Sequence, residues 1–219
     1  MKNDLRPSQS SVLLWVGHRA TSIRNSGKLD NTGSWQAREP ADHMFECGLY
    51  PTRLYSSTDV TSTETGEVMR DVLNKQTFAN LDKHNYQGAD APSPGVVHFG
   101  PAEWLDSASK RKPSEVTRVV LDNVTKEYDL KKCIALVACK NVVEALFNTL
   151  GGSVLGKIRK NMKQNTGTPS FFGFEYGVEC FSDLSVVKEA KYRFNFNKAP
   201  QRILSASVDK CEQIYIATP

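Results

Sequence analysis

The chain has 219 residues and a formal net charge of +4 at pH 7. Its composition is 39% hydrophobic, 24% charged and 9% aromatic. These values match an ordinary globular domain that can bury a core without disulfides, and they exclude a wholly disordered chain. A sequence pI near 8.7 is well short of the basicity of an arm that coats nucleic acid. Any electrostatic binding must therefore come from local clusters of charge.

The cysteines are five in number and lie far apart in the sequence. A secreted disulfide framework is usually denser and even-numbered, so this pattern predicts reduced thiols in an intracellular protein. Near the N-terminus only Val12–Val16 is apolar, which is too short for a signal peptide. No apolar run approaches the ~20 residues of a membrane span. We expect a cytoplasmic or virion-associated protein that is not secreted and has no transmembrane segment.

The first part of the chain alternates strand-like and helical patterns. Ser11–Gly17 is apolar and ends in glycine, which predicts a buried strand. His18–His43 contains glycines and a proline among polar residues and is interpreted as a long loop. Met44–Tyr50 and Thr52–Ser56 are strand-like. Apolar residues at helical spacing then predict a helix over Thr63–His84.

The middle of the chain begins with a turn-rich connection over Gln87–Pro94. We predict a single domain over residues 1–219, with a weak possible boundary near 87–95. Val96–Phe99 is expected to be a short strand and Pro101–Ser109 a short helix. Glu115–Leu130 fits strand and helix patterns, and a helix is favoured because Ser114 is a plausible N-cap.

The longest apolar run joins the densest basic cluster between Lys131 and Asn165. Cys133–Cys139 is either a central strand that feeds a helix over Asn141–Leu150, or part of one helix over Lys131–Leu150. Both interpretations end at a two-glycine turn, where a left-handed cap is easiest. A second, cationic helix is expected to begin at Ser153.

The last third of the sequence changes to a β pattern. Three aromatic or alternating segments, Phe171–Phe181, Val186–Asn197 and Arg202–Thr218, predict antiparallel strands. Their aromatic side chains are expected in a core more often than on a platform that stacks bases. The predicted fold class is α+β, with central helices packed on an antiparallel sheet that includes the C-terminal strands.

The basic cluster carries the functional prediction. Lysine and arginine on one helical face can pair with phosphate oxygens and release counterions. We predict a non-enzymatic, self-assembling protein. Its expected partner is nucleic acid, with RNA favoured, or an anionic surface. A viral coat, nucleocapsid or matrix-like subunit that forms a homo-oligomer would fit. The predicted contacts are Lys157, Arg159, Lys160 and Lys163, with Lys110, Arg111 and Lys112 as a second group.

Signs of catalysis are weak in the sequence. The four histidines, His18, His43, His84 and His98, show no zinc spacing with a cysteine. No phosphate-binding glycine loop appears, so no catalytic residue, metal or cofactor is predicted. Two alternatives stay open: an intracellular enzyme whose site assembles from distant residues, such as a Cys–His pair, and an assembly protein that binds anionic membranes.

Overall fold

The structure is a computed structural model that describes residues 11–24, 26–84, 96–126, 133–151, 171–181, 191–194, 200–206 and 211–216. Its first elements are β1 (Ser11–His18), α1 (Asn31–Glu46), β2 (Arg53–Ser56), α2 (Val60–His84) and β3 (His98–Pro101). The middle elements are α3 (Glu103–Ser109), α4 (Pro113–Lys126), β4 (Cys133–Ala138) and α5 (Lys140–Gly151). The last are β5 (Phe171–Phe181), β6 (Lys191–Phe194), β7 (Arg202–Ala206) and β8 (Cys211–Ile216).

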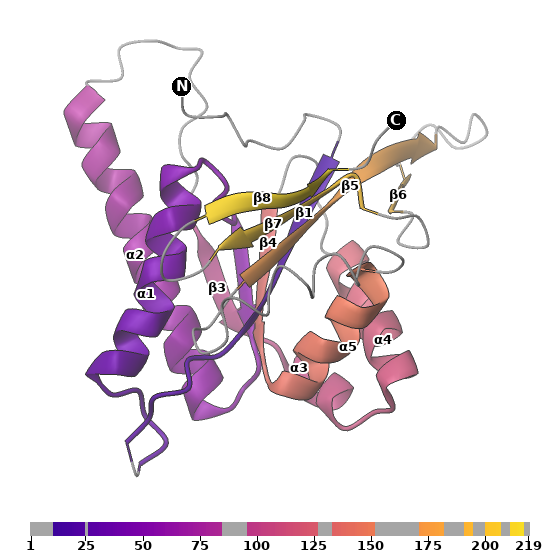
Figure 1. Cartoon of the computed structure of the whole chain (residues 1–219), viewed down its shortest axis with the longest axis horizontal. Helices are drawn as coiled ribbons and strands as arrows, with labels where there is room; N and C mark the ends of the chain where they lie inside the picture. The colour runs from indigo at the N-terminus through magenta and orange to yellow at the C-terminus, as the bar shows by residue number, and fades with distance from the viewer. Residues whose placement is uncertain are drawn as a thin grey trace.

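The strands form one mixed sheet in the order β3-β2-β4-β1-β5-β7-β8, and β6 pairs with β5 (Figure 1). The strands β3, β2, β4 and β1 are parallel to one another. From β1 onward, β5, β7 and β8 pair antiparallel. The predicted fold class is confirmed, because helices pack on a sheet whose C-terminal strands are antiparallel. The sheet also has a parallel half that the prediction did not include.

Helices cover both faces of this sheet. On one face, α1 and α2 pack against side chains such as Trp15 of β1 and Val137 of β4. On the other face, α3, α4 and α5 pack against Val16 of β1 and Leu136 of β4. Side chains along a strand alternate between faces, so neighbouring residues of β1 serve different cores. Figure 1 shows the sheet between the two groups of helices.

The segment predicted as a loop over His18–His43 contains most of α1, and this prediction is wrong. Asp30 caps the helix by accepting a hydrogen bond from the backbone N–H of Gly33 at 2.8 Å. Pro40 lies inside the helix, where a proline costs about 3 kcal/mol. The helix persists because its inner residues, including Met44, are buried against the sheet and α2. Tertiary packing therefore overrides local propensity here.

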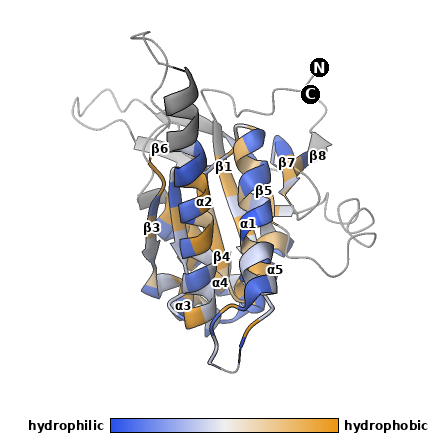
Figure 2. Cartoon of the chain, turned by 90° about the vertical axis from the view of Figure 1, so that its left-hand side faces the viewer, coloured by the Kyte–Doolittle hydropathy of each residue, from blue (hydrophilic) through white to orange (hydrophobic). Residues whose placement is uncertain are grey.

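The strand predicted over Met44–Tyr50 is also wrong, because α1 continues to Glu46 and a turn follows. Figure 2 shows α1 and α2 side by side, with hydrophilic and hydrophobic residues interspersed along each helix. Their mutual packing explains how a polar segment became part of the helical layer.

The two interpretations of the apolar run are resolved in favour of a strand. Cys133–Ala138 is the fully buried strand β4, and α5 follows directly. The ambiguous segment after Ser114 is helical, as α4. The expected cationic helix from Ser153 and the boundary near 87–95 lie outside the described residues, so the single domain stays a proposal. Among the described residues, no helix is long and apolar enough to cross a membrane.

Candidate active site

The candidate site lies at the carboxyl edge of the parallel strands. The chain leaves β1 towards α1 on one face of the sheet, and it leaves the adjacent strand β4 towards α5 on the other face. Two connections that diverge in this way mark the strand ends at which α/β sheets commonly bind ligands. The residues that end β1, β2 and β4 therefore define the place to look for chemistry.

His18 is the last residue of β1 and pairs with Ala138, the last residue of β4. Strand alternation puts it on the same face as Val16, towards α5. Burial of the half-exposed ring is the largest cause that lowers the pKa of His18 below 6.5. The charge of Glu144 opposes this shift, whereas Lys140 adds to it. At pH 7 the imidazole is therefore neutral and has a nitrogen lone pair available.

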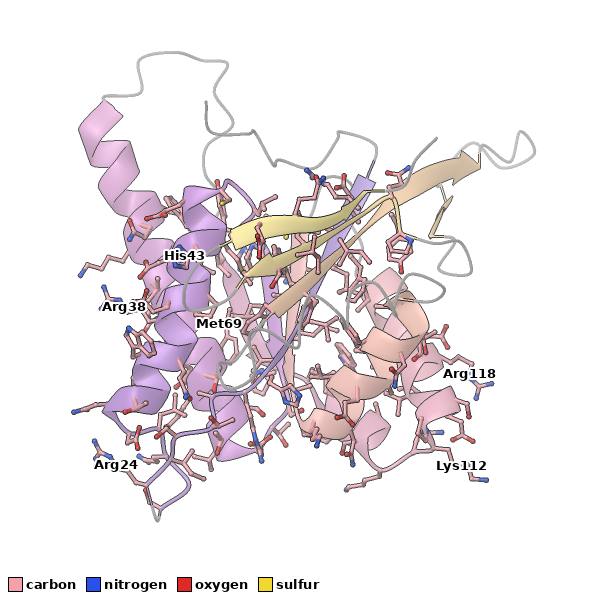
Figure 3. The ribbon with its side chains drawn as sticks, viewed as in Figure 1. Arg24, Arg38, His43, Met69, Lys112 and Arg118 are labelled. Carbon is pink, nitrogen blue, oxygen red and sulfur yellow. The ribbon has the colours of Figure 1, made fainter. Side chains whose placement is uncertain are left out.

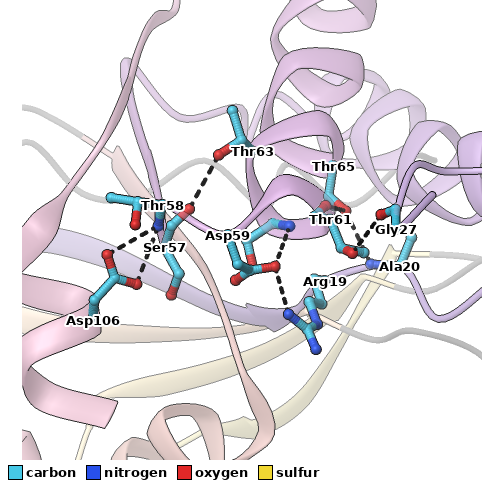
Figure 4. Close-up of polar contacts among 11 residues, drawn as sticks. Arg19, Ala20, Gly27, Ser57, Thr58, Asp59, Thr61, Thr63, Thr65 and Asp106 are labelled. Carbon is cyan, nitrogen blue, oxygen red and sulfur yellow. Dashed lines mark hydrogen bonds and ion pairs between the residues drawn. The ribbon is translucent and has the colours of Figure 1, made fainter. Parts of the chain in front are cut away.

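Arg19 follows directly, and its guanidinium is held at this edge. Its Nη1 lies 2.5 Å from Oδ1 of Asp59, and its backbone N–H donates to the carbonyl of Ala138 at 3.3 Å. Its side chain is 40% exposed, so further N–H groups of the guanidinium face solvent. Figure 4 shows the pair beside the start of α2. Arg19 is thus an oriented cation next to His18.

Asp59 is itself fixed by the first turn of α2. It accepts hydrogen bonds from the backbone N–H of Ser62 at 3.0 Å and from the Ser62 hydroxyl at 2.6 Å. Burial works against ionisation of Asp59, but the hydrogen bonds from Ser62 and the charge of Arg19 outweigh it. The pKa of Asp59 is therefore lowered, and the carboxylate is charged at neutral pH. One aspartate both caps α2 and orients Arg19.

A buried hydroxyl stands on the other side of β4. Ser57 follows β2, and its backbone N–H donates to the carbonyl of Val137 at 3.0 Å. Its side chain belongs to a residue only 2% exposed, and its Oγ has no hydrogen-bond partner among the described residues. With neighbouring strands ~4.8 Å apart, Ser57 and His18 flank the small Ala138 at about 10 Å from each other. The hydroxyl is a buried donor without a described partner, which costs free energy.

Thr58, the residue after Ser57, makes a backbone contact with α3. The backbone N–H of Thr58 donates to both carboxylate oxygens of Asp106 on α3, at 3.1 and 3.2 Å. This contact ties the loop after β2 to α3 (Figure 4). The loop that carries Ser57 is therefore supported from one side by α3 and from the other by β4.

The start of α5 lies at the same edge of the sheet. The carbonyl of Cys139 accepts hydrogen bonds from the N–H groups of Val142 and Val143, both at 3.1 Å, so this half-buried cysteine begins the helix. The positive end of the helix dipole consequently lies at the same edge as His18. Lys140 is exposed and pairs with Glu144 at 3.6 Å, one turn further along α5. The imidazole of His18 is therefore influenced by the charges of Lys140, Arg19 and Glu144.

A separate groove of about 540 Å³ lies between α1 and α2 and is lined by residues such as Trp35, Val68 and Lys75. It includes none of the groups at the carboxyl edge. We place the candidate site at the edge because a neutral histidine, an oriented arginine and a buried hydroxyl all lie there. Within the described ranges no group of three or more metal-ligating side chains comes together.

Three of the predicted contact residues lie in the described part of the chain, outside the elements that end at this edge. Lys110, Arg111 and Lys112 are exposed in the turn between α3 and α4, where Arg111 lies 3.8 Å from Glu115. Figure 3 shows Lys112 at the lower right, just before α4 begins, and Arg24 at the lower left. Lys157, Arg159, Lys160 and Lys163 lie outside the described residues.

The aromatic side chains at the start of β5 are core residues. Phe171, Phe172, Phe174 and Tyr176 are all at most 6% exposed. The Phe147 ring of α5 meets those of Phe172 and Phe174 edge to face, at 4.9 and 6.0 Å between centroids. The expectation of a core role is confirmed for these four.

The architecture matches solved structures of phosphatases. A protein of Agrobacterium tumefaciens assigned as the phosphohistidine phosphatase SixA superposes with a TM-score of 0.52, at 13% identity, over 83% of this chain and 94% of that one. The protein histidine phosphatase SixA complexed with tungstate has a TM-score of 0.49 at 12% identity, over 90% and 97%. No protein-family model and no curated protein matches the sequence. At 13% identity, the superposition on the first of these structures shows a shared fold and nothing more.

The prediction of a non-enzymatic assembly protein is wrong. The fold is that of a structure assigned as a phosphatase, and not that of a viral coat, nucleocapsid or matrix subunit. Three further predictions depended on this one and are withdrawn: the RNA or anionic-surface partner, the homo-oligomer and the virion association. The alternative of an enzyme whose site assembles from distant residues fits the finding better. The error arose because a basic cluster is visible in a sequence, whereas a cluster at strand ends forms only on folding.

Proposed function

We propose that the protein is a phosphatase in which His18 accepts the phosphoryl group of a phosphorylated substrate. One observation carries the proposal: a neutral, half-buried histidine ends a central parallel strand at the carboxyl edge, beside the end of β4. The structural similarity to a protein assigned as a phosphohistidine phosphatase supports the reaction class. We take phosphohistidine as the first substrate to test.

The chemistry needs a nucleophile that is unprotonated at neutral pH. A lone pair on the His18 ring attacks phosphorus, the bond from phosphorus to the leaving group breaks, and a phosphoramidate forms on the ring. Water then attacks the same phosphorus, the bond to the ring breaks, and inorganic phosphate leaves. The lowered pKa keeps the ring in the form that the first step requires.

Charge on the transferred group needs stabilisation during both steps. Arg19 can donate N–H groups to phosphoryl oxygens, and Lys140 supplies a second positive charge at the same edge. The unpartnered hydroxyl of Ser57 can donate one hydrogen bond, and the start of α5 adds the positive end of a helix dipole. These groups come from β1, β2 and α5, which explains why no contiguous motif marks the site.

The cellular setting belongs to the same proposal. The described cysteines are free, including Cys47, whose thiol lies 4.0 Å from the backbone carbonyl oxygen of Cys211. Cysteines this close stay reduced most readily inside a cell, so we place the phosphatase in the cytoplasm.

The test is release of phosphate from phosphohistidine and from an aryl phosphate by the purified chain. His18→Ala should reduce the rate on the order of 10³-fold or more. His43→Ala and His98→Ala are matched controls, because His43 sits on α1 beside Glu46 and His98 begins β3 at the opposite edge. A rapidly quenched reaction should also show one phosphoryl group on the peptide that contains His18. Turnover that persists in His18→Ala would refute the proposal.

A further inference from the structure

Three cysteines lie in or against the hydrophobic core between the sheet and α1. Cys47 is the C-cap of α1, Cys133 is the first residue of β4, and Cys211 is the first residue of β8. The Cys47 thiol lies 4.0 Å from the backbone carbonyl oxygen of Cys211. Both cysteine side chains also pack against the same core cluster. Segments that are 164 residues apart in sequence therefore bring two free sulfurs together.

The third thiol of the cluster is occupied elsewhere. Cys133 is 7% exposed, and its Sγ lies 3.4 Å from the backbone carbonyl of Leu49, to which it donates. Burial also raises the pKa of Cys133 well above its ordinary value. A buried, protonated thiol reacts slowly with an oxidant from solution. Cys47 and Cys211 are only half buried, so they are the accessible pair.

We propose that Cys47 and Cys211 are a dithiol modification site that closes to an intramolecular disulfide when it meets a low-molecular-weight disulfide such as oxidised glutathione. The sulfur of Cys47 attacks one sulfur of glutathione disulfide, which forms a mixed disulfide and releases one glutathione. The sulfur of Cys211 then attacks that of Cys47 and releases the second. The protein loses two electrons and two protons, and the glutathione disulfide gains them.

The order of attack follows from the surroundings of the two thiols. Burial is the largest cause that raises the pKa of Cys211, and the neighbouring Cys47 adds to it. The thiolate of Cys211 is therefore scarce, and the proposal assigns the first, bimolecular step to Cys47. The second step is intramolecular between neighbouring sulfurs, where proximity compensates for low nucleophilicity.

The disulfide would have a measurable consequence for stability. It would join the C-terminal end of α1 to β8, the last strand of the antiparallel half. A cross-link across 164 residues removes much of the entropy of the unfolded chain. The oxidised protein should therefore unfold at a higher urea concentration than the reduced protein. Because α1 also packs on α2, this cross-link would connect both helices of this layer to β8 in the antiparallel half of the sheet.

The test uses the full chain with oxidised glutathione, followed by alkylation and mass spectrometry of non-reduced peptides. We expect the loss of two hydrogen masses, one cross-linked pair containing Cys47 and Cys211, and a higher urea midpoint that reductant reverses. Cys47→Ser and Cys211→Ser should each abolish the pair. Cys139→Ser, between β4 and α5, is the matched control and should leave it intact.

Three outcomes would overturn the inference: a stable glutathione adduct at Cys47, a cross-link through another cysteine, or a disulfide-linked dimer. If both serine variants unfold, limited alkylation of the wild-type protein decides the question. Protection of Cys47 and Cys211 after oxidation supports the pair, and equal labelling before and after refutes it. This result does not depend on whether His18 accepts phosphate.

Discussion

Asp59 performs two tasks that substitution can separate. Asp59→Asn keeps a side-chain oxygen that can accept the backbone N–H of Ser62, so the cap of α2 is preserved. It removes the negative charge that pairs with Arg19. Asp59→Ala removes both. The two variants should therefore differ by the contribution of the cap, although they lose the same ion pair.

The magnitudes follow from exposure and hydrogen bonding. Arg19 and Asp59 are 40% and 37% exposed, so their pair contributes about 0.2–1 kcal/mol. Loss of an N-cap costs about 0.5–2 kcal/mol. We expect a modest loss for Asp59→Asn and a total loss of about 1–3 kcal/mol for Asp59→Ala. Arg19→Met should resemble Asp59→Asn, since it leaves the hydrogen bonds from Ser62 intact.

The assay is urea unfolding followed by circular dichroism, at neutral and at acid pH. Because the folded-state pKa of Asp59 is lowered, its stabilisation is present above its ordinary value of 3.8 and is lost as the pH falls through the folded value. The gap between wild type and Asp59→Asn should therefore shrink below that range. Asp71→Asn, which breaks the pair between the exposed Asp71 and Arg70 on the same helix, is the control. Equal losses for Asp59→Asn and Asp59→Ala would refute the capping argument.

Other substitutions test the core and the candidate site. Gly17→Ala places a Cβ 2.1 Å from the Phe171 ring and should cost about 1–3 kcal/mol, whereas Gly100→Ala meets nothing within 4 Å and should be nearly neutral. Arg202→Met removes the guanidinium whose Nε lies 2.6 Å from the buried carboxylate of Glu175. It should lower the free energy of unfolding by about 3 kcal/mol or more, measured by urea unfolding. Because the pKa of His18 is lowered, the unfolded chain binds more protons just below pH 6.5, so stability should rise with pH there. His18→Gln should remove that slope, and an unchanged slope would assign it to another group.

Several elements could be predicted because their signals are local. The strand at Ser11, the long helix that begins near Val60 and the strand–helix succession after Cys133 all follow from periodicity and length. α1 could not, because its glycine, internal proline and polar surface favour a loop until α2 and the sheet cover its inner face. Its N-cap, Asp30, was visible in the sequence but was not followed by a strong apolar repeat.

The candidate site needed the topology. His18 and Arg19 directly follow a predicted buried strand, and this position was the one sequence signal that pointed to them. Its meaning depends on knowing that β1 and β4 are parallel neighbours whose chains leave towards opposite faces. Ser57 gave no signal, because an ordinary serine becomes a candidate only when its hydroxyl is buried and unpartnered.

The sequence by itself determined the α+β class, the antiparallel C-terminal strands and most element types, because hydrophobic periodicity is encoded over a few consecutive residues. Only the tertiary structure decided the parallel order β3-β2-β4-β1 and therefore the edge at which β1, β2 and β4 end together. Strand order depends on contacts between residues far apart in the chain, for which a single sequence has no local pattern. The neutral His18, the oriented Arg19 and the paired thiols of Cys47 and Cys211 all depend on those long-range contacts.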